Sequence, residues 1–114
     1  MSDCLFCRIV KKEIPSQIVY ENDQILIFKD INPVASTHLL AIPKLHVDNV
    51  ADPRLLENNL LTALFTAIQE TVVVLNLKTD GFRVVINCGR DAGEAVPHLH
   101  LHLIAGRSLA WPPG

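Results

Sequence analysis

Three histidines alternate with leucines in residues 97–104, near the C-terminal end of the sequence. Successive side chains of an extended strand point to opposite faces, so we expect His98, His100 and His102 on one face and the leucines on the other. The leucines then belong to a core, and the histidines line an exposed face or a cleft. Three of the chain's 5 histidines lie at this strict spacing, which indicates that the three share a function.

Imidazole rings could act as metal ligands or as nucleophiles, and strand geometry limits the first use. At ~3.3 Å per residue, His98 and His102 lie about 13 Å apart along a strand. A zinc–nitrogen bond is only about 2 Å long, so at most two neighbouring histidines share an ion. A neutral imidazole, with an ordinary pKa near 6.5, attacks phosphorus well, and the adduct breaks down readily. Neighbouring histidines could then polarise phosphate oxygens or move protons.

A second group of candidate ligands begins with Cys4-x-x-Cys7. Two thiolates need two further ligands for tetrahedral zinc, and His46 and His98 are the candidates for a structural zinc site. Two buried thiols without metal, or a disulfide, are the alternatives. A redox pair of the thioredoxin type would need a βαβ context, which this position lacks. Cys88 is expected to be a small hydrophobic residue.

The elements that carry these residues follow from turn residues and hydrophobic patterns. We expect a short helix over 4–11 and strands over 18–20, 25–28, 38–42, 82–87 and 97–104. Asp52-Pro53 combines an N-cap acid with a proline at the first helical position, and a helix from there meets no Gly or Pro until about Leu77. Tight hairpin connections favour a largely antiparallel sheet. The fold class is therefore α+β, with five strands, one long and one short helix, as a single domain over residues 1–114.

The long helix is expected to be apolar around most of its circumference. One stripe of residues at helical spacing comprises Leu56, Leu60, Ala63, Leu64, Ala67, Thr71 and Val74, and a second comprises Leu61, Phe65, Ile68 and Val72. Such a helix must be covered on two sides. The domain's own sheet covers one side, and a second subunit is expected to cover the other, which predicts a homodimer. Loops of the same chain are the alternative cover.

Composition excludes several classes of protein. Hydrophobic residues make up 49% of the 114 residues and charged residues 19%, which is unlike a disordered chain. A net charge of −2 lacks the basic surplus of a nucleic-acid binder. No apolar stretch reaches the ~18 residues that span a bilayer, so no membrane partner is expected. The opening residues do not resemble a signal peptide and the cysteines number three, so we expect a reduced, cytoplasmic location.

The His98-x-His100-x-His102 pattern resembles the histidine triad (HIT) superfamily of nucleotide hydrolases and transferases. Similar segments extend over nearly the whole chain: Lys12-Glu13-Ile14-Pro15, Phe28-Lys29-Asp30-Ile31-Asn32-Pro33, Thr37-His38 and Ile42-Pro43-Lys44. The ending Trp111-Pro112-Pro113-Gly114 resembles the Hint branch in particular. The resemblance implies a HIT-like fold and a homodimeric, cytosolic purine nucleoside phosphoramidase. Such enzymes cleave the P–N bond of adenosine 5′-phosphoramidates and require no cofactor for catalysis.

The resemblance also implies roles for individual residues. His100 would be the nucleophile that becomes nucleotidylated, and the other catalytic histidines would be His102, His38 and His98. The implied nucleotide-binding residues are Phe28, Asp30, Ile31, Asn87, Glu94, Ala95, Val96, His100, His102 and Trp111. Asp30 would bind the ribose hydroxyls, and Trp111 would reach the neighbouring subunit's active site. Many bacterial HIT proteins have a similar Cys-x-x-Cys, which implies a structural zinc with His98 as a ligand.

Two residues depart from the Hint pattern on the loop before the triad. Glu94 and Ala95 stand where the family usually has Gln and Ser, and the family serine helps to protonate the leaving amine. An ionised Glu94 at 4 Å from a phosphate would be repelled by about 1 to 4 kcal/mol. Either Glu94 points away, or it is protonated and acts as the acid, or activity is weak. The alternatives to phosphoramidate hydrolysis are dinucleoside polyphosphate hydrolysis and nucleotide binding with little turnover.

Overall fold

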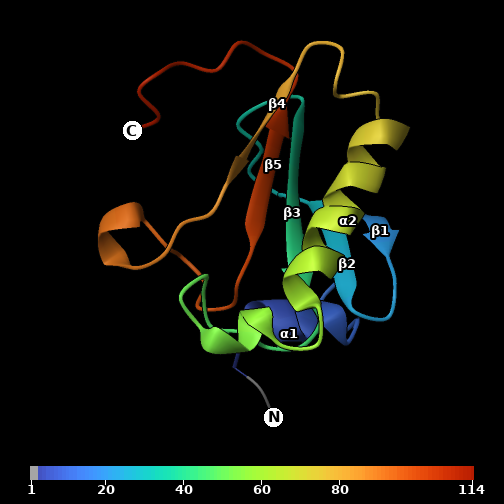
Figure 1. The fold of residues 1–114 in the computed structure, drawn as a ribbon, viewed down its shortest axis with the longest axis vertical. Helices are drawn as coiled ribbons and strands as arrows, with labels where there is room; N and C mark the ends of the chain where they lie inside the picture. Colours follow the sequence, from blue (N-terminus) through green and yellow to red (C-terminus); the bar gives the residue numbers. More distant parts are fainter. Residues whose placement is uncertain (1–2) are drawn as a thin grey trace.

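A five-stranded antiparallel sheet forms the centre of the computed structural model, which describes residues 3–114 (Figure 1). Its strands are β1 (Ile18–Glu21), β2 (Ile25–Lys29), β3 (Thr37–Pro43), β4 (Phe82–Val85) and β5 (Leu101–Ala105), in the order β1-β2-β3-β5-β4. Two α-helices, α1 (Leu5–Val10) and α2 (Leu60–Val74), and two short 3-10 turns, Pro53–Leu56 and Arg90–Ala92, complete the described chain. This arrangement confirms the predicted α+β class.

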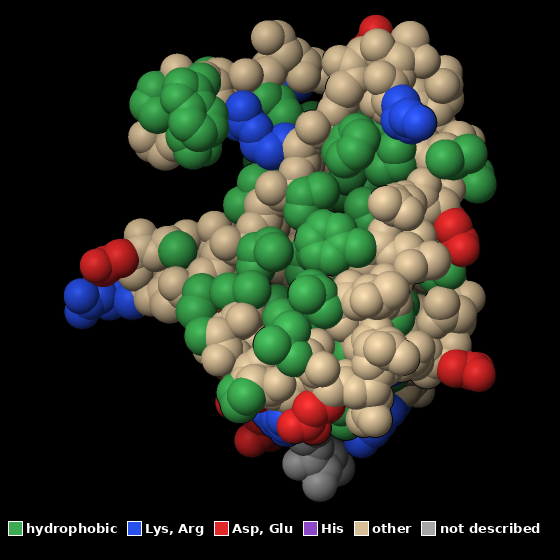
Figure 2. Space-filling view, viewed as in Figure 1, with side chains coloured by type: hydrophobic (Ala, Val, Ile, Leu, Met, Phe, Trp, Pro, Cys, Tyr) green, Lys and Arg blue, Asp and Glu red, His purple; other side chains and the backbone are tan. Residues whose placement is uncertain are grey.

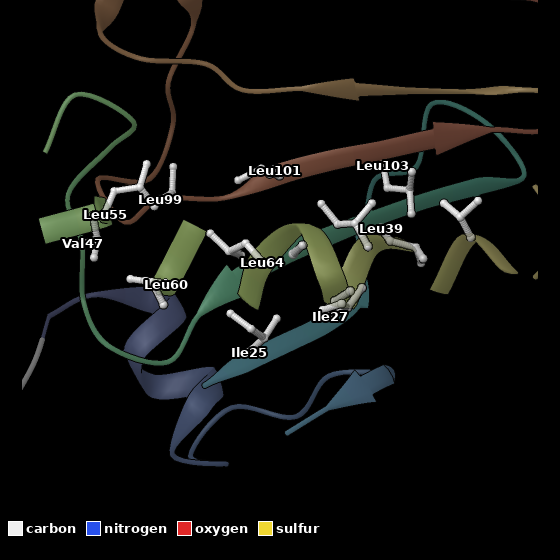
Figure 3. Packing of buried hydrophobic residues seen from close by; sticks show 14 residues of the cluster. Ile25, Ile27, Leu39, Val47, Leu55, Leu60, Leu64, Leu99, Leu101 and Leu103 are labelled. Carbon is white, nitrogen blue, oxygen red and sulfur yellow. The ribbon is translucent and has the colours of Figure 1, made fainter. Parts of the chain in front are cut away.

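The alternation of side chains along the strands divides the sheet into two buried faces. One face packs against α2 and holds the larger core, as Figure 3 shows for Ile27, Leu39 and Leu64. The opposite face packs against α1 and includes Leu26, Phe28, Leu40 and Ile42. In the β3–β5 register, Leu40 lies opposite His102. The face that packs on α1 therefore also carries the last triad histidine.

Helix α1 is short and is capped by a cysteine. The Cys4 Sγ accepts a hydrogen bond from the Cys7 N–H at 3.4 Å, and Lys12 ends the segment in the left-handed conformation at φ 62°. A helix of 6 residues is not stable alone in water. Packing of Phe6 and Ile9 against the sheet supplies part of its stability.

The long helix is shorter than predicted. The Asp52 carboxylate caps a 3-10 turn over Pro53–Leu56 by accepting from the Arg54 N–H at 3.0 Å. Asn58 and Asn59 then adopt left-handed conformations, with φ of 54° and 57°, and α2 begins only after them. Asparagine tolerates this conformation better than most residues, so it breaks the helix without Gly or Pro. No helix within residues 3–114 has the length and apolarity to cross a membrane.

The strand predicted to carry the triad, β5, begins four residues later than predicted and contains only His102 of the three histidines. The chain bends over residues 96–98, where the His98 N–H donates to the Val96 carbonyl, and the Leu99 N–H donates to the Val47 carbonyl. His98 and His100 both precede the strand, and His98 is 0% exposed. The prediction that all three histidines line an exposed face or cleft is therefore wrong for His98.

Candidate active site and metal centre

A cavity of about 390 Å³ lies between α1 and the sheet face that packs on it. Its apolar lining includes Phe6 and Ile9 from α1 and Leu40 from β3. The structure brings to this cavity the predicted nucleotide-binding residues Phe28, Asp30, Ile31, Ala95, Val96, His100 and His102. An apolar cavity with a few polar groups at one side is typical of a small-molecule site.

Three predicted nucleotide-binding residues do not line the cavity. Asn87 is partly buried just beyond β4, and Trp111 is 81% exposed on the C-terminal segment. The Glu94 Oε1 accepts from the Gly89 N–H at 3.0 Å, while the Glu94 N–H donates to the Gly89 carbonyl at 3.1 Å. This pair of hydrogen bonds closes the loop 89–94 on itself. The Glu94 carboxylate is thus engaged by its own loop.

One nitrogen of the His100 ring takes part in a hydrogen bond. Its Nδ1 lies 2.8 Å from the backbone carbonyl oxygen of His98, and a carbonyl can only accept, so Nδ1 carries the proton. The other nitrogen of the neutral ring, Nε2, therefore has the lone pair. The ring is 7% exposed and lies edge-on to Phe6, with centroids 5.1 Å apart. His100 thus presents a nucleophilic nitrogen in a fixed ring orientation.

Hydrogen bonds also fix the proton positions of His38 and His102. The Val34 N–H donates to the His38 Nδ1 at 3.1 Å, so the His38 Nε2 is protonated and donates to the His102 Nδ1 at 2.9 Å. The remaining proton of neutral His102 then lies on its Nε2. Burial, followed by repulsion from His100 and His38, lowers the pKa of His102 and favours the neutral ring.

The carboxylate of Asp30 lies beside His38 and His102. The Asp30 Oδ2 lies 3.4 Å from the His38 Nε2, and the Asp30 Oδ1 accepts from the Asn32 N–H at 2.8 Å. Asp30, His38 and His102 are close enough together to suggest a metal site. However, the His38 nitrogen that faces the other two is the protonated one, and it has no lone pair to give a metal. The group is better suited to holding a proton than to binding an ion.

Cys4, Cys7, His46 and His98 form a compact group that we call the Cys/His cluster. The His98 Nδ1 lies 3.3 Å from the Cys4 Sγ and 3.5 Å from the Cys7 Sγ. The His46 Nδ1 lies 3.3 Å from the Cys7 Sγ and 3.1 Å from the His98 Nδ1. The structure thus brings together the four residues that the sequence indicated as zinc ligands. Cys88 lies apart and is exposed, so the expectation of a small hydrophobic residue there is wrong.

The donor set of the Cys/His cluster fits a zinc ion. The His98 Nε2 lies 2.8 Å from the Pro43 carbonyl oxygen, and the His46 Nε2 lies 2.8 Å from the Asp48 Oδ1. Both Nε2 atoms therefore donate, and both Nδ1 atoms direct lone pairs into the cluster. The two Nδ1 atoms lie 3.1 Å apart and each lies 3.3 Å from a cysteine Sγ, so the four donor atoms are placed to share one ion. Tetrahedral zinc with bonds of about 2.0 to 2.3 Å would separate its ligands by about 3.3 to 3.8 Å, close to the observed spacings.

Burial supports the same conclusion for His98. It lowers the pKa of the His98 ring to about 4, so the ring is neutral at pH 7 and able to bind a metal.

The sequence reasoning missed three residues that shape these sites. Phe6 lines the cavity and contacts two triad rings, Asp48 orients His46, and Val34 fixes the proton of His38. Two weak signals were present: Phe6 lies between the paired cysteines, and Asp48 follows His46 by two residues. The role of Val34 depends on its backbone and has no signal in its side chain.

The protein-family model of the HIT domain matches residues 11–109 of this chain. An uncharacterized HIT-like protein of Synechococcus elongatus is 45% identical over 98% of this chain and 97% of its own length. The chain belongs to the HIT family. This HIT protein is also 43% identical to a 14 kDa zinc-binding protein of Zea mays, over 99% of this chain and 89% of the maize protein.

Solved structures give the same result for the fold of this HIT protein. A HIT family hydrolase of Legionella pneumophila superposes with a TM-score of 0.93 at 41% identity, covering 98% of this chain and 100% of that chain. The predicted HIT-like fold is confirmed. The narrower resemblance to the Hint branch and the single-domain assignment stay predictions.

Proposed function

We propose that this HIT protein hydrolyses the P–N bond of nucleoside 5′-phosphoramidates, such as AMP-lysine, through a covalent nucleotidyl intermediate on His100. The observation that carries this proposal is the hydrogen bond from the His100 Nδ1–H to the His98 carbonyl at 2.8 Å. It leaves the Nε2 lone pair as the nucleophile in a ring that lines the cavity. The similar Legionella pneumophila protein is a HIT family hydrolase, which supports hydrolysis in general.

In the first step, the His100 Nε2 attacks the α-phosphorus and the P–N bond to the amine breaks. The leaving amine needs one proton, which is delivered from solvent through the Nε2 of His102. In the second step, water attacks phosphorus, the bond from phosphorus to His100 breaks, and one proton returns to solvent. AMP and free amine are the products. Phe28 and Ile31 would line the base and sugar, and Asp30 would bind the ribose hydroxyls.

The two departures from the Hint pattern bear differently on this mechanism. The Glu94 carboxylate accepts from the Gly89 N–H, which supports the alternative that it points away from the phosphate. Ala95 lines the cavity but has no proton to give, so protonation of the amine depends on His102 alone. Because a single donor makes protonation of the amine slower, a second candidate function is a nucleotide-binding module with little turnover. Dinucleoside polyphosphate hydrolysis would use the same nucleophile, so only a panel of substrates distinguishes it from phosphoramidate hydrolysis.

The Cys/His cluster would hold a structural zinc ion. Its two thiols and two imidazole nitrogens provide the S₂N₂ set that zinc prefers, and a relative in Zea mays is a zinc-binding protein. The ion would join the start of α1 to the segments that carry His46 and His98. It supplies stability in this proposal, and no catalytic step passes through it. Thiols that bind zinc suit the reduced cytoplasm, where we place the protein.

A homodimer would cover the apolar surface between α2 and β4. Figure 2 shows hydrophobic side chains gathered on the face that carries α2. Phe65 and Val73 of α2 and Phe82 of β4 are exposed, and Val73 and Phe82 line a groove with Ile68 and Val72. Because β4 is an edge strand, its outer backbone groups are also available to a second copy.

The C-terminal segment is placed to take part in such a dimer. The Arg83 guanidinium donates to the Ala110 carbonyl at 3.0 Å and holds the segment beside β4. Trp111, the next residue, is exposed. In the proposed dimer, it would reach the partner's nucleotide site.

The test is AMP release from AMP-lysine by the zinc-loaded wild type, by His100→Ala and by a Cys88→Ser control that changes an exposed side chain. We expect turnover by the wild type and the control, and a loss of about 10³-fold or more in His100→Ala, because the covalent route is removed. Mass spectrometry of quenched wild-type protein should find one AMP on a histidine. If neither the wild type nor the Cys88→Ser control turns over AMP-lysine but AMP binds, the nucleotide-binding module is the better assignment.

A further inference from the structure

We propose that the Cys/His cluster controls the orientation of the nucleophilic ring, with His98 and Phe6 as positioning residues, so that metal loading makes His100 competent to bind and react with nucleotide. This inference rests on the proposed function for its catalytic consequence. The structural part of the proposal concerns the His100 ring, helix α1 and the Cys/His cluster, and it can be tested without measuring turnover.

The first connection runs through the backbone of His98. The side chain of this residue points its Nδ1 into the cluster, and its Nε2 donates to the Pro43 carbonyl. Its own carbonyl accepts from the His100 Nδ1–H. The same residue is therefore both a candidate metal ligand and the group that orients the nucleophile. A ligand held at two ring nitrogens fixes the peptide whose carbonyl sets the tautomer of His100.

The second connection runs through Phe6, which lies between the two cysteines on the same helical turn. Its ring is edge-on to His98, with centroids 5.8 Å apart at 81°, and edge-on to His100, with centroids 5.1 Å apart at 77°. Phe6 is buried and also lines the cavity. Any shift of α1 therefore moves a side chain that contacts the nucleophilic ring and forms part of the nucleotide site.

The third element is the limited stability of α1 itself. A helix of 6 residues has too few internal hydrogen bonds to persist without outside support. The contacts that hold it include the packing of Phe6, Ile9 and Val10 and the cluster at its first turn. Without a metal, the thiols and the two Nδ1 atoms are joined by weak thiol–imidazole hydrogen bonds, from the Cys4 Sγ to the His98 Nδ1 and from the Cys7 Sγ to the His46 Nδ1, each at 3.3 Å. Replacing the metal bonds by these weaker contacts therefore loosens the start of α1 and the His98 peptide together.

The experiment compares zinc-loaded, chelator-stripped and zinc-restored protein in a Cys88→Ser background, where every remaining thiol belongs to the cluster. Far-UV circular dichroism reports folding, calorimetry with AMP reports binding, and ¹⁵N spectra of the histidine rings report the tautomer of His100. We expect the stripped protein to stay folded, to bind AMP about 10-fold or more weakly, and to lose the single Nδ1–H tautomer of His100. Added zinc should restore all three signals.

A second variant keeps the proposal testable if stripping unfolds the chain. Phe6→Leu retains every ligand of the cluster and keeps an apolar side chain, whereas Arg8→Gln changes an exposed residue on the same helix. We expect Phe6→Leu to bind one zinc, yet to show a mixed His100 tautomer and a kcat lowered about 10-fold. Arg8→Gln should match the wild type in each measurement.

The outcomes separate this inference from the proposed function. An unchanged His100 tautomer and unchanged AMP binding, in both the stripped protein and Phe6→Leu, would overturn the positioning role. If the zinc-loaded protein turns over no phosphoramidate but its His100 signals still follow the metal, the proposed function fails and the positioning role stands.

Discussion

The Nε2 of His38 lies 2.9 Å from the Nδ1 of His102, although 64 residues separate them in the sequence. The two residues belong to the paired strands β3 and β5, where His38 lies opposite Ile104 and His102 lies opposite Leu40. The Val34 N–H on the far side of His38 fixes the direction in which its ring donates. The contact therefore holds His102 in the tautomer whose Nε2 carries a proton.

The first prediction follows from this hydrogen bond. Because His38 acts only through His102, His38→Ala should lower kcat for AMP-lysine by about 10²-fold and leave the AMP affinity nearly unchanged. His102→Ala should lower kcat at least as much. The double variant should be no slower than His102→Ala, and steady-state kinetics on all three variants provides the measurement. Losses that multiply in the double variant would show that His38 acts independently.

Much of the fold could be predicted because its patterns are local. The Glu21-Asn22-Asp23 turn marked the β1–β2 hairpin, and alternating apolar residues marked the sheet. The predicted helix start at Asp52-Pro53 is wrong because Asn58 and Asn59 break the helix through left-handed conformations that Asn residues permit but do not require. The bend at 96–98 was missed because perfect alternation of His and Leu predicts a longer strand than the structure has.

The candidate site was predictable as a set of residues but not as a set of contacts. His46 and His98 were indicated as partners of the cysteines because zinc needs four ligands. The contact of Phe6 with His100 could not be foreseen, because it depends on how α1 packs across the sheet. The engagement of Glu94 by the Gly89 N–H likewise depends on the closed loop rather than on either residue alone.

The second prediction concerns the missing proton donor at position 95. Ala95 lines the cavity, so Ala95→Ser would place a hydroxyl where the leaving amine is expected. We expect kcat for AMP-lysine to rise by about 10-fold, because an added acid shares the protonation with His102. Ala95→Val is the matched control, since it adds bulk without a proton. An equal rate in the wild type and Ala95→Ser would show that amine protonation does not limit turnover.

The third prediction concerns pH and stability. Burial lowers the pKa of His102 below its ordinary value of 6.5, so the unfolded chain binds more protons than the folded one as the pH falls below 6.5. The contribution of His102 to the free energy of unfolding is complete above pH 6.5 and is lost as the pH falls through the lowered pKa. His102→Gln, which does not titrate, should therefore show a smaller loss of unfolding free energy between pH 7 and 5. Urea unfolding at each pH measures the difference, and parallel curves for the two proteins would contradict it.

The fourth prediction tests the homodimer at two adjacent positions of α2. Val73 lines the groove between α2 and β4 and is 67% exposed, whereas Val74 is 80% exposed and does not line it. Analytical ultracentrifugation should find the wild type and Val74→Glu as dimers and Val73→Glu as a monomer, because the new carboxylate would be buried without a partner charge at the interface. The monomer should keep its circular dichroism spectrum, since Val73 contributes little to the core of one subunit. A monomeric wild type would remove the dimer, and dissociation by Val74→Glu alone would place the interface on another face of the helix.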